Sequence, residues 1–83
     1  MMVQDIENKI IELLEVKSEA LIQDTNVFIQ EIGLDSIQYI ELLVEIEQIY
    51  SIEFEEDKLF GSAFERLSDL IKYVDVRVSE ANK

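Results

Sequence analysis

The sequence contains no cysteine and no histidine. These two absences exclude thiolate nucleophiles, imidazole general bases and the usual zinc ligands. They also exclude a disulfide framework, so nothing in the cysteine content indicates a secreted protein. We therefore predict no zinc site. We also expect no other metal ion, because the acidic run Glu55, Glu56 and Asp57 lacks the Gly and the ligand spacing of a dedicated divalent-ion loop and is explained by a helix start.

Proline is also absent, glycine occurs only twice, and there is no long apolar run. A helix that spans a bilayer needs about 20 consecutive apolar residues, and no stretch comes near that length. The first residues are acidic, unlike those of a secretory signal peptide. We therefore expect a cytoplasmic protein that does not insert into membranes.

Basic residues are few, with 7 Lys and Arg against 19 Asp and Glu, for a formal net charge of −12. A surface this acidic repels phosphate backbones and anionic lipids, which excludes nucleic acid and anionic membranes as partners. It favours basic partners and fast, electrostatically steered encounters. Because like charges repel within the folded chain, we also expect salt or divalent cations to stabilise it.

The length of 83 residues indicates one domain, residues 1–83, with a polar tail at 79–83. A content of 48% apolar residues is enough for one compact core. A chain of this size buries only about 60–65% of its unfolded surface, so its margin of stability is narrow.

Residues 33–38 have the pattern of a turn followed by a helix start. Gly33 tolerates either sign of φ, Asp35 is a strong N-cap residue, and Gln38 can complete a capping box with it. Ser36 then lies in the first helical turn, where free N–H groups and the positive end of the dipole favour a negative group. Its hydroxyl could carry a phosphate-linked cofactor; the alternative is that Ser36 only caps the helix.

The helix predicted from Ser36 to Tyr50 is apolar on two faces. At about 100° per residue, one side carries a core stripe: Tyr39, Leu42, Leu43, Ile46, Ile49 and Tyr50. The opposite side carries Ile37, Ile40 and Val44 among Glu41, Glu47 and Gln48. A neighbouring loop could cover Ile37 and Ile40, but little chain remains for this. We therefore predict a docking surface there.

The remaining pattern predicts an all-α fold. Apolar residues three and four apart indicate further helices at about Val3–Glu15 and Leu67–Val78. Residues 16–35 form a long ordered connection whose apolar side chains should pack on the core: Leu21, Ile22, Val27, Phe28, Ile29 and Ile32. Ile52 and Phe54 should plug the core, before a short helix that opens at Glu55, includes Leu59 and Phe60, and ends at Gly61 and Ser62. We expect a small antiparallel bundle of three main helices and one short helix, with a long first loop.

The segment Phe28-Ile-Gln-Glu-Ile-Gly-Leu-Asp-Ser-Ile37 and the amphipathic stretch after it resemble the acyl carrier and peptidyl carrier protein family. The resemblance covers nearly the whole chain, including the Ile52/Phe54 pair and the start of the last helix at Leu67. It implies an acyl-carrier-like fold.

The resemblance also implies a covalent cofactor and a set of partners. A 4′-phosphopantetheine arm would be joined to Ser36 by a phosphopantetheinyl transferase using coenzyme A, and Asp35 would help that enzyme place its magnesium ion. The thiol of the arm would carry an acyl or aminoacyl thioester, so the chain would be a covalent carrier and not an enzyme, and the missing His and Cys are no handicap. Partner enzymes that load or condense acyl groups, with basic docking surfaces, would read a face that includes Ile37, Ile40, Glu41, Val44 and Glu47. We expect the carrier to be a monomer.

Two departures from the family pattern stand out. Arg66 replaces the Thr that many relatives have before the last helix, so capping there should differ. Gln38 and Gln48 stand where acids are common, which can alter partner choice. We expect an acyl carrier of fatty-acid, polyketide or related specialised biosynthesis. The alternatives are a peptidyl carrier of nonribosomal peptide synthesis, a D-alanyl carrier, an acidic interaction module and a phosphorylation-controlled binder.

Overall fold

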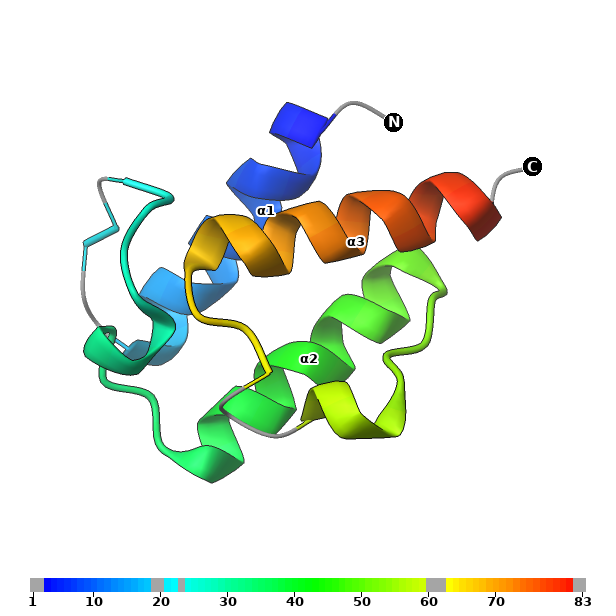
Figure 1. The fold of residues 1–83 in the computed structure, drawn as a ribbon. Coiled ribbons are helices and arrows are strands. Elements are labelled where there is room, and N and C mark those ends of the chain that lie inside the picture. Colours follow the sequence, from blue (N-terminus) through cyan, green and yellow to red (C-terminus); the bar gives the residue numbers. More distant parts are fainter. Residues whose placement is uncertain (1–2, 19–20, 23, 60–62, 82–83) are drawn as a thin grey trace.

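The computed structural model describes residues 3–18, 21–22, 24–59 and 63–81. In that part of the chain the elements are α1 (Val3–Ser18), η1 (Ile29–Glu31), α2 (Ser36–Tyr50), η2 (Glu56–Leu59) and α3 (Leu67–Ala81), where η marks a 3-10 helix (Figure 1). The predicted all-α fold with three main helices is confirmed. None of the described helices is long and apolar enough to cross a membrane.

The three main helices do not all alternate in direction. Gln38, in the first turn of α2, donates to the carbonyl of Lys17 at the end of α1. The pKa of Tyr50, at the end of α2, is raised by burial and by the nearby charge of Asp5, near the start of α1, so α1 runs opposite to α2. Arg77, near the end of α3, donates to the carbonyl of Glu53, just past the end of α2. The long connection that contains η2 therefore returns the chain to the start of α2. As a result α3 runs in the same direction as α2, and α1 is the antiparallel member (Figure 1).

A single core lies between the helices, and none of the described polar or charged residues is buried in it. The buried residues are Ile6, Ile10 and Leu14 from α1, Tyr39, Leu42, Leu43 and Ile46 from α2, and Leu67, Leu70, Ile71, Val74 and Val78 from α3, together with Ile29, Ile32, Ile52, Phe54 and Phe64. The predicted core positions of Ile52 and Phe54 are confirmed. Phe54 stacks on Tyr73 with ring centroids 5.4 Å apart, and this contact attaches the connection between α2 and α3 to α3 itself.

Two helices end later than predicted. α1 continues three residues beyond Glu15, because no Gly or Pro follows and the Ser18 hydroxyl donates to the carbonyl of Leu14 at 2.8 Å. α3 continues to Ala81, where the prediction had a polar tail from 79. Arg77 and Glu80 pair across one turn of this extension at 3.8 Å. Residues 82–83 lie outside the described part of the chain.

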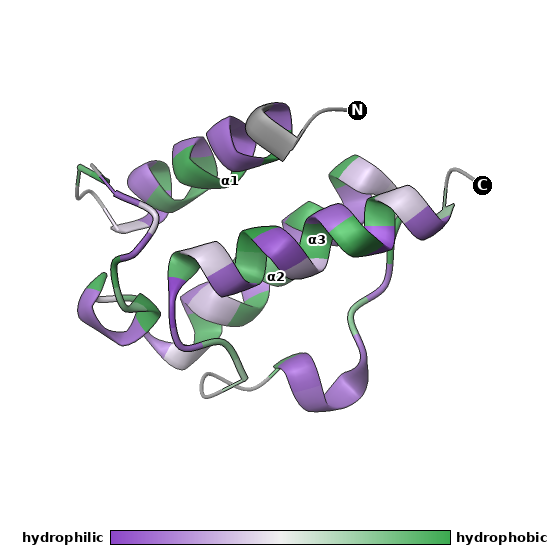
Figure 2. Cartoon of the chain, turned by 45° about the horizontal axis from the view of Figure 1, so that its top comes forward, coloured by the Kyte–Doolittle hydropathy of each residue, from purple (hydrophilic) through white to green (hydrophobic). Residues whose placement is uncertain are grey.

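The connections differ from the prediction in two further respects. The short helix is the 3-10 helix η2, which is mostly hydrophilic (Figure 2); Phe60, Gly61 and Ser62 lie outside the described residues. In the first loop, Ile22 packs against the core and its N–H is held by Glu15 Oε2 at 2.9 Å. Its neighbour Leu21 is exposed, so the predicted packing of Leu21 on the core is wrong.

The first loop is bonded to the beginning of α3 through the backbone. Leu67 N donates to the carbonyl of Val27 at 3.0 Å, and Ser68 N donates to that of Thr25 at 2.8 Å. These bonds satisfy N–H groups that the first turn of a helix leaves without intrahelical partners. The loop that leads to Ser36 is thereby fixed to another helix rather than free.

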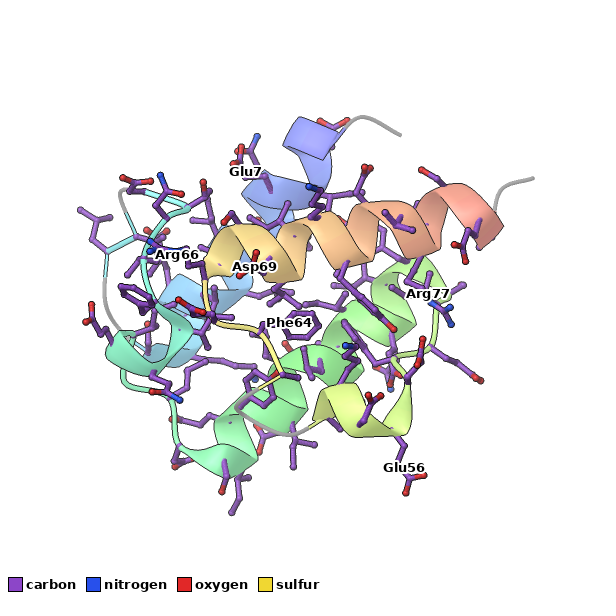
Figure 3. The ribbon with its side chains drawn as sticks, in the orientation of Figure 1. Glu7, Glu56, Phe64, Arg66, Asp69 and Arg77 are labelled. Atoms are coloured by element: carbon purple, nitrogen blue, oxygen red, sulfur yellow. The ribbon has the colours of Figure 1, made fainter. Side chains whose placement is uncertain are left out.

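Arg66 reinforces the same junction. Its backbone N–H donates to Asp69 Oδ2 at 3.0 Å, so the side chain of Asp69 contributes to the cap of α3. Its guanidinium lies 4.2 Å from the centre of the Phe28 ring and donates to the carbonyl of Asn26 at 2.9 Å. Figure 3 shows Arg66 and Asp69 together at the beginning of α3, beside the first loop. Whether capping here is weaker than, or different from, that of relatives with Thr stays a prediction.

Candidate functional site

The turn that begins α2 is built by local chemistry. Gly33 has φ +92°, in the region that favours glycine. Asp35 is the N-cap: its Oδ1 accepts from Gln38 N at 2.7 Å, and its own N–H donates to Gln38 Oε1 at 3.1 Å. The predicted capping box is confirmed. Gln38 Nε2 also donates to the carbonyl of Lys17 at 3.4 Å, which ties the start of α2 to the end of α1.

Ser36 is the first residue of α2 and is exposed. Within the described residues its hydroxyl has no hydrogen-bond partner, so the oxygen is open to a reagent. Beside it lies a hollow of about 190 Å³ lined by Ile29, Gln30, Leu34, Asp35, Ser36 and Tyr39. The first-turn N–H groups and the helix dipole favour negative charge at this place. The site therefore has both the room and the electrostatics for a phosphate-linked group.

Tyr39 is one of the residues that line this hollow. Its ring is buried, and its hydroxyl donates to the carbonyl of Lys58 at 3.3 Å, which attaches η2 to α2. Burial raises the pKa of Tyr39 to about 12, so the phenol is neutral at physiological pH. Tyr39 thus supports the site as a structural side chain.

The second face of α2 is uncovered. Ile37, Ile40 and Val44 expose 67%, 42% and 39% of their surface, and they follow Ser36 along the helix. On the core side, Tyr39, Leu42, Leu43 and Ile46 are buried as predicted. Ile49 is exposed, against the prediction. At about 100° per residue it lies roughly 70° from the centre of the core stripe, and it is in the last turn, where less chain covers it.

The carboxylates beside this face already have partners within the chain. Glu41 Oε2 and Glu45 Oε1 lie 3.5 and 3.2 Å from Lys17 Nζ. On the opposite edge, Glu47 Oε2 accepts from Phe54 N at 2.8 Å. Glu47 therefore holds the chain just past α2, in addition to any part it has in recognition.

Sequence reasoning missed Lys17 and Glu45. One signal was present, because Glu41 and Glu45 are like charges four residues apart on a helix, an arrangement that is destabilising alone. A nearby cation was therefore to be expected. No group of three or more metal-ligating side chains is gathered among the described residues, and we assign no metal site.

Comparison with known proteins extends the resemblance. A family model described as "Phosphopantetheine attachment site" matches residues 4–74. The acyl carrier protein of Rickettsia typhi is 34% identical over 77 residues, covering 89% of this chain and 87% of the relative. That of Syntrophus aciditrophicus is 34% identical over 76 residues, covering 87% of this chain and 91% of the relative.

The fold has a counterpart among solved structures. The crystal structure of an acyl carrier protein from Thermotoga maritima matches with a TM-score of 0.78 and 23% sequence identity, covering 95% of this chain and 93% of that one. At this identity the structural match speaks for the fold alone, and the family rests on the sequence matches. The chain therefore belongs to the acyl carrier protein family of phosphopantetheine-binding, non-catalytic carriers.

Proposed function

We propose that Ser36 is the attachment point of a 4′-phosphopantetheine arm and that the chain carries acyl groups on it as thioesters, for fatty-acid, polyketide or related biosynthesis. The observation that carries this proposal is an exposed serine hydroxyl in the first turn of α2, inside the segment that matches the family model. The arm supplies the thiol that the chain lacks.

The residues around Ser36 fit such a group. A phosphodiester there retains a negative charge, which the first-turn N–H groups and the helix dipole stabilise. Asp35 is exposed, and its Oδ1 is engaged by the cap. Its second oxygen lies outside that hydrogen bond, which supports a role for Asp35 in presenting the magnesium ion of the transferase.

Mass spectrometry tests the attachment. The unmodified chain is incubated with coenzyme A, magnesium and a broad-specificity phosphopantetheinyl transferase, and we expect a gain of one phosphopantetheinyl group. Ser36→Ala should show no gain, whereas Ser79→Ala, which alters an exposed serine of α3, should gain as the wild type does. An unmodified wild type, or a modified Ser36→Ala, would overturn the proposal.

We also propose that the transferase and the acyl-loading and condensing enzymes dock on the second face of α2. The partner would bring apolar side chains to Ile37, Ile40 and Val44, with basic side chains toward Glu41. The support is an exposed apolar strip that begins beside Ser36, on a chain with a net charge of −12. An uncovered apolar strip with charged edges is typical of a surface that meets partners transiently.

The substitution Val44→Arg tests this surface. Because Val44 is exposed, the fold should survive, while a cation in the apolar strip should repel a basic partner and lower the loading rate about tenfold, equivalent to about 1.4 kcal/mol. Val76→Arg, at an exposed valine of α3, is the control with the same change in charge. Unfolding of Val44→Arg, or equal slowing by Val76→Arg, contradicts the docking face.

The cargo is identified on protein isolated from its native cell. An acyl thioester supports the proposed pathway class, and an aminoacyl thioester indicates a peptidyl carrier instead. An unmodified protein whose partner still binds Ser36→Ala indicates an interaction module.

We further propose that the carrier works in the cytoplasm, where fractionation of the native cell should find it.

A further inference from the structure

We infer that Lys17 is a specificity-determining residue of the docking face. It is a cation of the chain itself that forms ion pairs with Glu41 and Glu45, and it thereby selects against strongly basic partners. The inference rests on the proposed docking of partners along α2. It concerns a residue of α1 that the sequence pattern did not connect with that face.

The geometry places Lys17 between the two helices. Its ammonium lies 3.5 Å from Glu41 Oε2 and 3.2 Å from Glu45 Oε1. The side chain of Lys17 is only 13% exposed, while those of Glu41 and Glu45 are 58% and 43% exposed. The lysine stem is thus packed beneath the carboxylates, as long basic side chains commonly are. A partner that approaches from solvent therefore reaches the two carboxylates first, and the ammonium of Lys17 lies beneath them.

The position of Lys17 is fixed by its backbone as well. Gln38, which completes the cap of α2, donates from Nε2 to the carbonyl of Lys17 at 3.4 Å. The other ion pairs of the described residues, Lys9–Glu12 and Arg77–Glu80, join residues three apart in one helix. In the part of the chain that the structure describes, the pairs of Lys17 alone connect two helices.

These contacts lower the negative charge that the face presents. Glu41 and Glu45 together carry a charge of −2, and Lys17 reduces the local sum to −1. A partner cation that approaches Glu41 also approaches the ammonium of Lys17, and this like-charge repulsion disfavours strongly basic surfaces. The surface therefore fits a partner that takes most of its contact from Ile37, Ile40 and Val44 and places only a few basic side chains toward Glu41, in place of a densely basic surface.

The test measures how loading by the phosphopantetheinyl transferase depends on salt. Lys17→Met keeps the packed stem and removes the charge, and it leaves two exposed, solvated carboxylates, so the fold should persist. Lys72→Met, at an exposed lysine of α3, is the matched control with the same change in net charge. The quantity compared is kcat/KM for the carrier, with thermal unfolding of each variant as the check on folding.

We expect Lys17→Met to raise kcat/KM about three- to tenfold at low salt, and Lys72→Met to change it less than about twofold. The difference should vanish near 1 M salt, where the Debye length is about 3 Å. Lys17→Arg, which keeps the cation, should behave as the wild type. Equal rates and salt slopes for Lys17→Met and Lys72→Met overturn the inference, as does a slower Lys17→Met or a faster Lys17→Arg.

If Lys17→Met is unstable, Glu45→Gln addresses the same point. Lys17 then lies against Glu41 alone, and loading should be slower than in Glu53→Gln, which alters an exposed glutamate outside α2. Equal rates overturn the inference. Failure of the proposed function is distinguishable, because in that case the wild type accepts no arm, whereas Lys17 is judged on rate differences among chains that all accept it.

Discussion

At the scale of single residues, Glu47 is a carboxylate beside the proposed docking face that also stabilises the fold through a hydrogen bond. Its Oε2 accepts from Phe54 N, and Phe54 is part of the core. Glu47→Ala should lower the free energy of unfolding by about 1–2 kcal/mol, because it leaves the N–H of Phe54 without its acceptor. Urea unfolding measures this.

Two variants sharpen that experiment. Glu47→Gln retains an acceptor oxygen and should lose less than half as much stability as Glu47→Ala. Glu41→Ala removes an exposed carboxylate and should change stability by less than about 0.5 kcal/mol. Similar losses for Glu41→Ala and Glu47→Ala would show that the hydrogen bond to Phe54 is unimportant.

Tyr39, which is buried, and Tyr50, which is half-buried, affect the stability of the chain at high pH. Burial raises the pKa of Tyr39 from 10.0 to about 12, and burial with the nearby charge of Asp5 raises that of Tyr50. The folded state therefore holds these protons more tightly than the unfolded state does. This contribution is complete below pH 10, and it is lost as the pH rises from 10 to about 12. We expect the free energy of unfolding to fall across that interval.

Tyr39→Phe is the variant that checks the pH dependence. It cannot ionise at this position, so its stability should fall less steeply between pH 10 and 12, although Tyr50 still titrates. Urea unfolding at several alkaline pH values, with tyrosinate absorbance recorded in parallel, gives the comparison. An alkaline slope identical to that of the wild type would mean that Tyr39 contributes nothing to it.

At the scale of elements, the beginning of α3 depends on the first loop as much as on its own residues. Arg66→Ala should cost about 1–2 kcal/mol, because it removes the hydrogen bond to the carbonyl of Asn26 and the contact with the Phe28 ring. It should also speed hydrogen exchange at the amides of Leu67 and Ser68, whose N–H groups donate hydrogen bonds to carbonyls of the first loop.

The form of the cation matters at this junction. Arg66→Lys can still donate to Asn26, but it lacks the planar guanidinium that stacks on Phe28, so its stability should be intermediate. Lys72→Ala, at an exposed position of the same helix, is the control and should be close to neutral. If Arg66→Ala is also neutral, the backbone bonds alone hold the loop to α3.

At the scale of the whole molecule, the net charge of −12 opposes the compact state. Raising monovalent salt from about 0.02 to 0.5 M at neutral pH screens this repulsion. It also weakens the exposed ion pairs, but such pairs contribute little. We therefore expect a stabilisation of about 1 kcal/mol, or roughly 4–8 °C in Tm.

Thermal unfolding followed by circular dichroism measures that shift. Magnesium at equal ionic strength should have the same effect if screening alone is at work, and a larger shift would indicate that the ion binds. A Tm that stays constant across the salt titration would show that self-repulsion is a minor term in the stability of this chain.

The sequence by itself determined the features whose causes lie within a few residues. The turn at Gly33, the cap formed by Asp35 and Gln38, and the place of Ser36 in the first turn of α2 follow from local backbone chemistry. The core stripes of the helices follow from spacing, since residues three and four apart share a face. The family resemblance carried by the same residues was sufficient to anticipate the fold and the cofactor.

Only the tertiary structure decided features that join distant parts of the chain. The ion pairs of Lys17 with α2 and the contacts of the first loop with α3 connect residues far apart in sequence, and the hydrogen bond from Phe54 to Glu47 forms only because the chain turns back after α2. The exposure of Leu21 and Ile49 belongs here too. Helical periodicity reports which residues share a face, whereas burial and ion pairing depend on what the folded chain places against that face.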